Sequence, residues 1–436
     1  MTPAEPLPMT FAPAGPLKGI ARVPGDKSIS HRALMLAAMA RGTSRIDGLS
    51  DGTDVAATSA ALGAMGVGIG RSGGSVLVDG VGTGGLLPPE GALDMGNSGT
   101  ATRLLMGLVA SHPVSAAFTG DASLCRRPMD RVIAPLRRLG ADILASAGGR
   151  LPLMIRGLCP AVPLTHRLDI ASAQVKSALL LAALNTPGIT RVVEPVRTRD
   201  HSERLLDRFG ARIARRGAEI ELHGEAALRP QHVEVPGDAS AAAFLIVAAL
   251  VVPGSHVRIE GVGVNPMRTG LFELLGAMGA DLRIENPRDL GGEPVADIVA
   301  AYSPLRAVDV PPDIIPAMID EFPIFFIAAA FADGVSRATG LAELRVKESD
   351  RIAAMAAGLR AIGVTARDGE DGLVVEGSAG RPVAGGATIA SALDHRVAMS
   401  FAVAGLHAAK PVTVDDMSPV ATSFPAFAAT LGELAR

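Results

Sequence analysis

The stretch PGDKSISHRALMLAA (residues 24–38) combines a turn, a helix-start signal and a run of apolar residues. A second stretch, PGDASAAAFLIVAAL (residues 236–250), has the same opening and a similar apolar run, but no lysine, histidine or arginine. An Asp placed before an apolar run is typical of a helix N-cap. Each stretch therefore predicts a buried helix, and the repetition predicts two similar halves. We expect the second copy to keep only the structural role.

Buried helices of the same kind are predicted at six places. Each segment opens with Ser, Asp or Asn and then becomes almost wholly apolar. The segments begin at intervals of 66 to 82 residues, near Asp26, Asn97, Ser172, Asp238, Asp320 and Asp394. The regular interval indicates an internal repeat.

A second phrase alternates with the buried helices. It reads Leu, two residues, an apolar residue, Gly, and then Ala or Val, as in LGAMGVGI and LRRLGADI. Leu and the apolar residue three positions later share one helix face, and Gly can end the helix in a left-handed conformation. An alternating segment follows, as in 141–157, and predicts a strand, a turn and a strand. The phrase begins at Leu62, Leu136, Leu206, Leu275 and Leu359, with a truncated sixth copy at Leu431. Six units of about 70 residues, grouped three and three, are expected.

The composition excludes several classes of function. The chain has 436 residues, a net charge of −3, one tyrosine and no tryptophan, and 48% of it is hydrophobic. Without a basic run or many aromatic residues, neither a nucleic-acid partner nor a membrane partner is expected. The two cysteines form no C-x-x-C pair, and no P-loop motif is present, so neither a zinc site nor an ATP site is indicated. The N-terminal stretch does not resemble a signal peptide, and we expect a cytoplasmic protein.

Charged residues gather at or near the predicted helix openings. Each one alone has a structural explanation as a helix cap or a surface residue, and for Arg127 or Arg351 alone a solvated face is favoured. Cations repeated in this way instead favour phosphate and carboxylate ligands. Carboxylates among them can transfer protons. The cations and carboxylates are Lys27, Arg32, Arg103, Arg127, Lys176, Arg199, Asp320, Glu321, Arg345, Lys347, Glu348, Arg351 and Arg396. If the six buried helices converge at their N-termini, their dipoles add to the same anion site.

At this point a family resemblance can be stated. The phrases PGDKSISHRALMLAA, GNSGTATRLLMGL, GDASLCRRPM, SAQVKSALLLAAL, TRDHSE, IPAMIDEFP, RVKESDRI and DHRVAMSF follow one another between about residues 20 and 425. In that order they resemble the family of 5-enolpyruvylshikimate-3-phosphate synthases (3-phosphoshikimate 1-carboxyvinyltransferases). SAQVK and RDHSE are similar to the bacterial class II branch.

The resemblance implies an α/β fold of two domains, known as the enolpyruvyl transferase fold or inside-out α/β barrel. Six βαβαββ units are expected, three in each domain around buried helices. Domain I would comprise residues 1–22 and 238–436, and domain II residues 23–237. The active site would lie in the cleft between them.

The resemblance also implies an activity. The family transfers the enolpyruvyl group of phosphoenolpyruvate to the 5-hydroxyl of shikimate 3-phosphate, through a tetrahedral intermediate that loses phosphate. This step belongs to the shikimate pathway, which leads to chorismate and the aromatic amino acids. No metal and no organic cofactor is expected, the chain is expected to be a monomer, and glyphosate is expected to compete with phosphoenolpyruvate.

Site residues follow from the positions that match the family. Those expected to bind shikimate 3-phosphate are Lys27, Ser28, Arg32, Ser172, Ala173, Gln174, Arg199, Asp320 and Lys347. Those expected to bind phosphoenolpyruvate are Lys27, Gly99, Arg127, Gln174, Arg351 and Arg396. Asp320 is expected to accept the hydroxyl proton, and Glu348 or Lys27 to deliver a proton to the methylene carbon.

Three positions bear on the branch of the family. Thr422 stands where class I members carry a lysine, so that anion contact is absent or replaced. The one tyrosine, Tyr302, lies outside every motif, and Arg199 would take over part of the site where class I stacks a tyrosine on the shikimate ring. Gly99 stands where glyphosate-insensitive class II members carry alanine. His31 is expected to support its neighbours rather than to act in catalysis.

Two rivals remain. One is UDP-N-acetylglucosamine enolpyruvyl transferase, which uses a loop cysteine some residues before an Arg-Pro pair. Cys125 lies before Arg127 and Pro128, but the spacing is too short, and GDKS-x-x-HR replaces the K-N opening of that enzyme. The other is an RNA-processing protein of similar units, which would need a basic face and stacking aromatic residues.

Cys125 distinguishes the first rival. We expect Cys125→Ser to retain full activity with shikimate 3-phosphate, because no covalent step through this thiol is required. The rate of phosphate release by the variant and the parent chain measures this. A loss of turnover in a folded variant would favour the cysteine-dependent enzyme.

Overall fold

The computed structural model describes residues 5–436, which form two compact units. Unit 1 contains the described residues up to Pro24 together with Gly237–Arg288 and Pro294–Arg436. Unit 2 contains Gly25–Pro236 and Asp289–Glu293. Each unit has its own cluster of buried apolar side chains, so each has a separate hydrophobic core.

Unit 2 consists of three blocks with the same order of elements, β-α-β-α-β-β. In each block the first two strands are parallel and the final hairpin is antiparallel. The first block is β14 (His232–Glu234), α1 (Lys27–Met39), β3 (Arg41–Asp47), α2 (Thr53–Ala64), β4 (Gly68–Ser72) and β5 (Ser75–Val81). The second is β6 (Leu93–Asp94), α3 (Gly99–Ala110), β7 (Ser115–Thr119), α4 (Asp130–Arg138), β8 (Asp142–Ser146) and β9 (Arg150–Arg156), with a 3-10 turn at Leu124–Arg126. The third is β10 (Thr165–Arg167), α5 (Ala173–Ala183), β11 (Ile189–Val193), α6 (His201–Arg208), β12 (Ile213–Arg216) and β13 (Glu219–His223).

Unit 1 repeats this plan with modifications. Its first block is β2 (Lys18–Ala21), α7 (Ala239–Val251), β15 (His256–Gly263), α8 (Gly270–Ala277), β16 (Asp281–Leu290) and β17 (Glu293–Ala301). The second is α9 (Ile315–Met318), α10 (Phe322–Phe331), β18 (Val335–Ala338), α11 (Arg351–Ala361), β19 (Thr365–Asp368) and β20 (Leu373–Glu376), with 3-10 turns at Pro312–Ile314 and Ala342–Val346. The third is β21 (Val383–Gly385), β22 (Thr388–Ile389), α12 (His395–Gly405), β23 (Ala408–Lys410), β24 (Val412–Val414), a 3-10 turn at Ser418–Thr422, and α13 (Phe427–Leu434).

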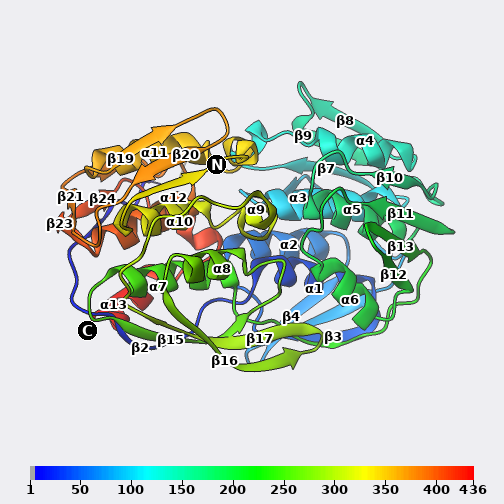
Figure 1. Cartoon of the computed structure of the whole chain (residues 1–436). Coiled ribbons are helices and arrows are strands. Elements are labelled where there is room, and N and C mark those ends of the chain that lie inside the picture. The colour runs from blue at the N-terminus through cyan, green and yellow to red at the C-terminus, as the bar shows by residue number, and fades with distance from the viewer. Residues whose placement is uncertain (1–4) are drawn as a thin grey trace. The chain divides into compact units, whose positions relative to one another are not determined.

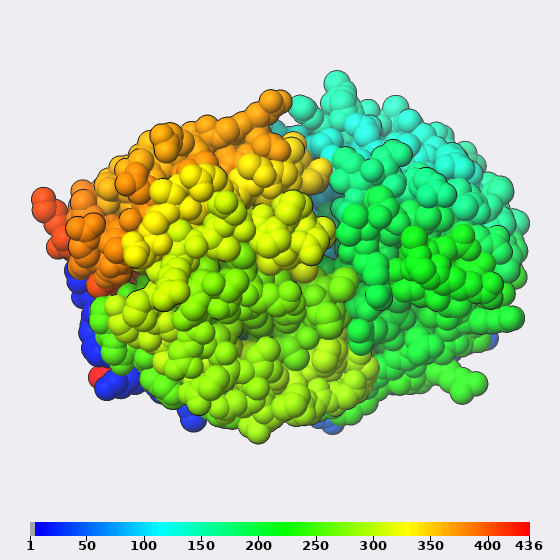
Figure 2. Space-filling model, in the orientation of Figure 1, coloured from blue at the N-terminus to red at the C-terminus, as the bar shows by residue number. Residues whose placement is uncertain are grey.

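Two blocks of unit 1 differ from this order of elements. In the second block, the leading strand is reduced to two isolated parallel bridges, Arg306–Asp333 and Asp309–Arg337. In the third block, the chain stops after α13, and the N-terminal strand β1 (Met9–Phe11) pairs antiparallel with β24. The blue N-terminal and red C-terminal segments accordingly lie along the same edge in the space-filling view (Figure 2).

The Pro-Gly-Asp motifs mark the places where the chain changes unit. Strand β2 is followed in sequence by α1 but lies parallel to β15, and β14 is followed by α7 but lies parallel to β3. Within unit 2 the Asp26 N–H donates to the Pro236 carbonyl over 2.7 Å, and within unit 1 the Asp238 N–H donates to the Pro24 carbonyl over 2.8 Å. Each copy of the motif therefore lies where the chain passes from one unit to the other.

The six buried helices are confirmed. In unit 2, α3 packs against both α1 and α5, and in unit 1 the helices α7, α10 and α12 pack against one another. Figure 1 shows the sheets of each unit outside these helices. The N-caps are Asp26, Ser98, Ser172, Asp238, Glu321 and Asp394, and all except Glu321 accept a backbone N–H with their side chain.

The helices predicted from the second repeated phrase are also confirmed. The glycine of each phrase follows its helix with a positive φ, between 86° and 106°, as a left-handed C-terminal residue requires. These glycines are Gly66, Gly140, Gly210, Gly279 and Gly363. The strand-turn-strand expected over 141–157 is the hairpin of β8 and β9.

Helix length bears on the expected absence of a membrane partner. Among residues 5–436, no single helix is long and apolar enough to cross a membrane. One bent pair, Pro312–Met318 with Phe322–Phe331, has sufficient length and apolar content. Every residue of α10 in that pair is buried in the core of unit 1, which accounts for its composition.

Gly25 provides a test of the crossing. A Cβ atom at this position would lie 1.8 Å from the Gly48 carbonyl oxygen, so the backbone would have to move. We expect Gly25→Ala to lower the free energy of unfolding by about 3 kcal/mol, as overpacking in a fixed backbone does. Denaturant unfolding followed by circular dichroism measures it. Gly63→Ala in α2 is the matched control, because its Cβ meets nothing within 4 Å; an equal loss in both variants would contradict the close approach.

Candidate functional site

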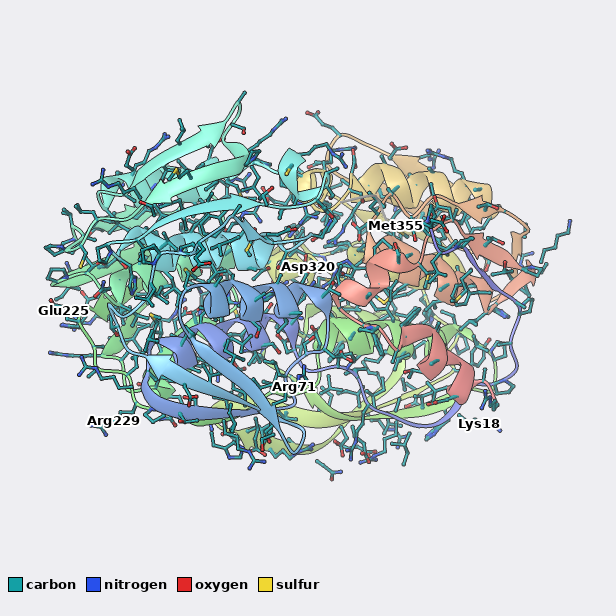
Figure 3. The ribbon with its side chains drawn as sticks, turned by 180° about the vertical axis from the view of Figure 1, so that it is seen from behind. Lys18, Arg71, Glu225, Arg229, Asp320 and Met355 are labelled. Atoms are coloured by element: carbon teal, nitrogen blue, oxygen red, sulfur yellow. The ribbon has the colours of Figure 1, made fainter. Side chains whose placement is uncertain are left out.

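Charged side chains fall into two groups in this structure. Arg71, Glu225 and Arg229 are exposed and stand at the outer surface of unit 2 (Figure 3). Arg32, Arg127 and Arg351 are instead between 1% and 5% exposed. A buried guanidinium is costly unless its donors are hydrogen-bonded. The partners of the buried group therefore reveal how the candidate site is built.

The opening of α1 holds the first cation. Asp26 accepts the Ile29 N–H over 2.9 Å and caps the helix. Lys27 follows as the first helical residue, and its Nζ lies 3.0 Å from Oδ2 of Asp54 in the first turn of α2. Both side chains are largely covered, with 17% and 10% exposed. The ion pair fixes the Lys27 ammonium at the end of a buried helix, where Ser28 also lies.

Arg32 lies one turn further into α1. Its Nε donates to Ser202 Oγ and its Nη2 to Ser177 Oγ, each over 2.7 Å. The remaining Nη1 donates to the Ser28 carbonyl over 2.9 Å. Three neutral oxygens from α1, α5 and α6 thus hold the guanidinium in one orientation.

The openings of α3 and α5 are joined by side-chain hydrogen bonds. Arg103 Nη1 donates to Gln174 Oε1 over 2.8 Å, and Gln174 Nε2 donates to Thr100 Oγ1 over 2.9 Å. Ser172 caps α5 by accepting the Val175 N–H over 3.3 Å. The amide of Gln174 is therefore oriented by both of its ends.

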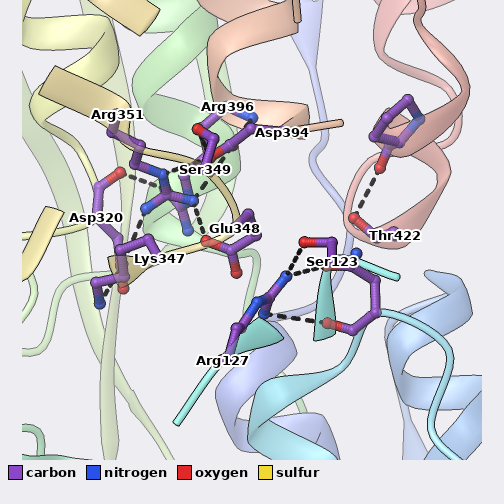
Figure 4. A network of polar contacts seen from close by, with 12 residues as sticks. Ser123, Arg127, Asp320, Lys347, Glu348, Ser349, Arg351, Asp394, Arg396 and Thr422 are labelled. Atoms are coloured by element: carbon purple, nitrogen blue, oxygen red, sulfur yellow. Dashed lines mark hydrogen bonds and ion pairs between the residues drawn. The ribbon is translucent and has the colours of Figure 1, made fainter. Parts of the chain in front are cut away.

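Arg127 follows the 3-10 turn that precedes α4. It donates to the Asn97 carbonyl and to Ser123 Oγ, each over 3.2 Å, and also to Asn97 Oδ1 (Figure 4). Gly99 lies beside this guanidinium: a Cβ there would be 3.2 Å from Arg127 Nη1 and 2.9 Å from Arg103 Nη1. The missing side chain of Gly99 leaves room for two arginines.

The structure brings most of the expected residues of unit 2 to helix openings. Lys27, Ser28, Gly99, Ser172, Ala173 and Gln174 all lie in a first turn or at its cap. Arg199 lies in the segment between β11 and α6 and is partly buried.

Unit 1 contains a separate cluster around Arg351, the first residue of α11. Its Nε donates to Asp394 Oδ2 over 2.8 Å, and its Nη2 donates to Glu348 Oε2 over 2.6 Å. Its Nη1 lies 3.4 Å from Asp320 Oδ1, which also accepts Lys347 Nζ over 3.2 Å (Figure 4). Ion pairs therefore join four of the unit 1 residues expected from the sequence: Asp320, Lys347, Glu348 and Arg351. The fifth, Arg396, contacts this group through the Asp320 carbonyl.

Electrostatics explain how this cluster stays charged. Burial by itself lowers the pKa of Arg351, but the attraction of Asp394 and Glu348, together with the hydrogen bond to Asp394, raises it overall far above its ordinary range. Asp394 is fully buried and caps α12, so its position is set by the helix. The guanidinium is thus a permanent cation among carboxylates.

Arg396 connects the cluster to the second Pro-Gly-Asp motif. Its Nη1 donates to the Asp320 carbonyl over 2.9 Å and lies 3.5 Å from Glu321 Oε1. Glu321 in turn accepts the Ser240 hydroxyl, and Arg268 Nη2 donates to Ser240 Oγ over 2.7 Å. The expectation that the second copy has only a structural role stays a prediction; its serine is hydrogen-bonded to the carboxylate beside Arg396.

Asp320 and His31 both lie where the sequence predicted. The fifth buried helix starts near Asp320, since α10 begins at Phe322 with Glu321 at its N-cap, and the Asp320 carboxylate pairs with Lys347. His31 is fully buried, and burial, followed by Lys27 and Arg32, holds its pKa well below the ordinary value. Its Nδ1 is 2.7 Å from Thr58 Oγ1. A neutral, enclosed ring fits a supporting role.

Several residues of these networks were not singled out from the sequence. Asp54, Asn97, Ser202, Ser240 and Arg268 are the main ones. Each contacts a partner 27 to 170 residues away, and nothing in the local pattern distinguishes these contacts from caps and turns. Among residues 5–436, no group of three or more His, Cys, Asp or Glu side chains is arranged to hold a metal ion.

The family assignment rests on comparisons with known proteins. The family model described as EPSP synthase (3-phosphoshikimate 1-carboxyvinyltransferase) matches residues 11–431. The chain belongs to the EPSP synthase family. A protein of Sphingopyxis alaskensis named 3-phosphoshikimate 1-carboxyvinyltransferase is 60% identical over 444 aligned positions that cover 100% of both chains. One of Zymomonas mobilis with the same name is 57% identical, covering 99% of this chain and 97% of its own.

Solved structures agree with this family. An EPSP synthase of Acinetobacter baumannii superposes with a TM-score of 0.87 at 46% identity, covering 98% of both chains. The enolpyruvyl transferase NikO of Streptomyces tendae shares the fold at 20% identity, with a TM-score of 0.78 over 99% of this chain and 98% of its own. The predicted enolpyruvyl transferase fold is confirmed, and the EPSP synthase family, not the UDP-N-acetylglucosamine enzymes, is the one identified.

Gly99 provides the test of the arginine pair. We expect Gly99→Ala to raise the inhibition constant of glyphosate by roughly tenfold or more, because its methyl group would press against two guanidiniums that have little room to move. Inhibition assays at several concentrations of phosphoenolpyruvate measure this. Gly63→Ala is the control, because its Cβ meets nothing within 4 Å. Gly107→Ala is unsuitable, because its Cβ would meet the backbone of α5. An unchanged constant in a folded Gly99→Ala variant would contradict the prediction.

Proposed function

We propose that this chain transfers the enolpyruvyl group of phosphoenolpyruvate to the 5-hydroxyl of shikimate 3-phosphate and releases phosphate. The observation that carries the proposal is the pair of residue sets described above. Unit 2 presents arginines and a lysine at helix openings, and unit 1 presents carboxylates bound to Arg351 and Lys347. The match to the EPSP synthase family over residues 11–431 supports this assignment.

Shikimate 3-phosphate is bound chiefly by residues of unit 2 in this proposal. Arg32 and Arg199 bind its charged groups, while Lys27, Ser28, Ser172, Ala173 and Gln174 supply further donors at two helix N-termini. Helix N-termini favour anions because their N–H groups and dipoles face the ligand. Asp320 and Lys347 of unit 1 approach the target hydroxyl.

Phosphoenolpyruvate is held by cations from both residue sets. Lys27, Arg127, Gln174 and Gly99 belong to unit 2, and Arg351 and Arg396 belong to unit 1. Arginine suits this ligand because its planar donor fork matches phosphate and carboxylate oxygens. Fixed charges also stabilise a transition state without reorganising during the reaction.

Proton transfer falls to the carboxylates and lysines. Asp320 accepts the proton of the 5-hydroxyl as its oxygen attacks the central carbon of phosphoenolpyruvate, and Glu348 or Lys27 delivers a proton to the methylene carbon. In the tetrahedral intermediate the new C–O bond has formed, the C–C double bond has become a single bond, and the methylene group has become a methyl group. Loss of phosphate and return of a methyl proton then restore the double bond, so no metal or organic cofactor takes part.

Of the carboxylates Glu348 and Asp394, which both contact Arg351, Glu348 is the better placed to deliver a proton. Its carboxylate contacts Arg351 and is 20% exposed, whereas Asp394 on the same guanidinium is fully enclosed. A dianion arriving at Arg351 competes with both carboxylates for that cation, and a nearby negative charge favours the protonated form of an acid. The more accessible acid can then take up a proton and pass it on.

The proposal extends to the setting of the enzyme. It acts as a monomer in the cytoplasm, without a nucleic-acid or membrane partner. Glyphosate competes for the phosphoenolpyruvate site, where it would meet Arg127 beside Gly99.

A phosphate-release assay with both substrates tests the function. The purified chain should release phosphate only when shikimate 3-phosphate and phosphoenolpyruvate are both present. Replacing the acceptor by UDP-N-acetylglucosamine should give none. No release from the folded chain with fresh substrates would overturn the proposal.

Asp320 provides a sharper test of the mechanism. We expect Asp320→Asn to reduce kcat by about 10²- to 10⁴-fold, since the amide cannot accept the hydroxyl proton. Asp313→Asn, at an exposed acid of the same block, is the matched control and should keep the parent kcat. A folded Asp320→Asn variant with the parent kcat would remove Asp320 from the proton-transfer step.

A further inference from the structure

Lys176 is a buried charge that the reaction described above does not use. It lies in the second turn of α5, four residues after Ser172, and its side chain is 0% exposed. Its Nζ lies 2.8 Å from Glu203 Oε1 and 3.1 Å from Glu194 Oε1, and it donates to the Thr198 carbonyl over 3.4 Å. No ligand can reach a side chain so enclosed without rearrangement. The three partners all belong to residues 194–203.

A second cation completes the network. Arg215 on β12 donates to Glu194 and lies 3.4 Å from Glu203 Oε1. Two cations and two carboxylates therefore form a quartet of zero formal charge, and Glu194 within it is 0% exposed. Buried ion pairs of this kind contribute little net stability compared with apolar packing, and one known use is to fix a single conformation.

The quartet determines the conformation of residues 194–203. Glu194 accepts the Thr198 N–H over 3.2 Å and also the Thr198 hydroxyl, which closes the segment into a loop. Arg199 follows immediately in the chain. Ser202 lies at the other end of the segment and accepts Arg32 Nε over 2.7 Å. The segment is thus tied to α5 by Lys176 and to α1 by Arg32.

We infer that Lys176 is a positioning residue that holds residues 194–203, and with them Arg199, against the N-terminal part of α5. Lys176 does not touch substrate. It couples the helix that carries Ser172, Ala173 and Gln174 to the loop that carries Arg199, so the two groups of donors keep one spacing. Its effect on shikimate 3-phosphate rests on the proposed function, whereas its effect on the loop does not.

Kinetics with both substrates test the first effect. Lys176→Met removes the cation but keeps most of the side-chain volume, and leaves a net charge of −1 in the quartet. We expect KM for shikimate 3-phosphate to rise roughly ten- to hundredfold, as a misplacement of about 1 Å in a binding group does. KM for phosphoenolpyruvate should change less than about twofold, because its proposed ligands lie mostly on other elements.

Tryptic cleavage tests the second effect without any substrate. Trypsin cuts after Arg197 and Arg199, and cleavage requires the loop to open locally. We expect cutting at these two sites, mapped by mass spectrometry, to be about tenfold faster in Lys176→Met than in the parent chain. If the parent chain released no phosphate, the proposed function would fail while this measurement still decided the role of Lys176.

Three companion variants keep the test decisive. Lys176→Met/Glu203→Gln restores a neutral network and should recover part of both effects. Thr198→Val removes one hydrogen bond to Glu194 and should raise KM for shikimate 3-phosphate by roughly threefold, even if Lys176→Met does not fold. Glu221→Gln is the control, since it breaks the Arg191–Glu221 pair at 2.7 Å on the sheet of the same block and should change neither measurement.

The outcomes separate positioning from plain stability. If folded Lys176→Met and Thr198→Val keep the parent KM and the parent cleavage pattern, the quartet serves stability alone and the inference is wrong. Equal effects in Glu221→Gln would also overturn it, because any lost ion pair of the block would then suffice. A rise in KM for shikimate 3-phosphate together with faster cleavage only in the quartet variants supports it.

Discussion

A buried cation needs fixed acceptors on every side, and this requirement shapes both units of the structure. Arg351 is 1% exposed and is surrounded by Asp394, Glu348 and Asp320. Removing one partner from such a group typically costs 3–5 kcal/mol, so the elements that carry the partners cannot move independently. The cap of α12, the start of α11 and the residues before α10 are therefore held in one arrangement by a single side chain.

The same requirement connects chemistry to the crossing of the chain. The Pro-Gly-Asp motifs bring the two connections between the units into hydrogen-bonded pairs, and each ends in the Asp that caps a buried helix. In the first copy the next residue is Lys27, whose ammonium is fixed by Asp54. In the second copy, Asp238 Oδ1 and Ser240 instead accept Arg268, and Ser240 donates to Glu321 beside Arg396. Both copies thus support cationic groups, one directly and the other through a chain of hydrogen bonds.

Local patterns made the repeat predictable, and long-range contacts limited what else could be predicted. Caps such as Asp26, Ser172, Asp238 and Asp394 were recognisable because the cap side chain and the backbone N–H that donates to it lie within three residues. The start of α10 near Asp320 was recognisable in the same way, since an acid precedes an apolar run and Pro323 stands in the first turn. The pairing of β1 with β24 joins residues about 400 positions apart, and no local pattern indicates it.

The candidate site shows the same division. Residue identities came from phrases that resemble a family, whereas partners such as Asp54 for Lys27 or Glu194 for Lys176 became visible only in three dimensions. Glu194 comes directly after β11 and has the sequence pattern of an ordinary surface acid. Its enclosure depends on α5, β12 and α6 meeting at one point, which is a property of packing.

The kind of acceptor around each cation suggests a division of labour. The hydrogen bonds described for Arg32, Arg103 and Arg127 go to hydroxyl, amide and carbonyl oxygens, which orient each guanidinium. Arg351 and Lys347 are held by carboxylates, which neutralise them and supply proton acceptors. The first arrangement suits the binding of a dianion, since it fixes the directions of the donors. The second suits proton transfer, since carboxylates that can take up a proton are held in place.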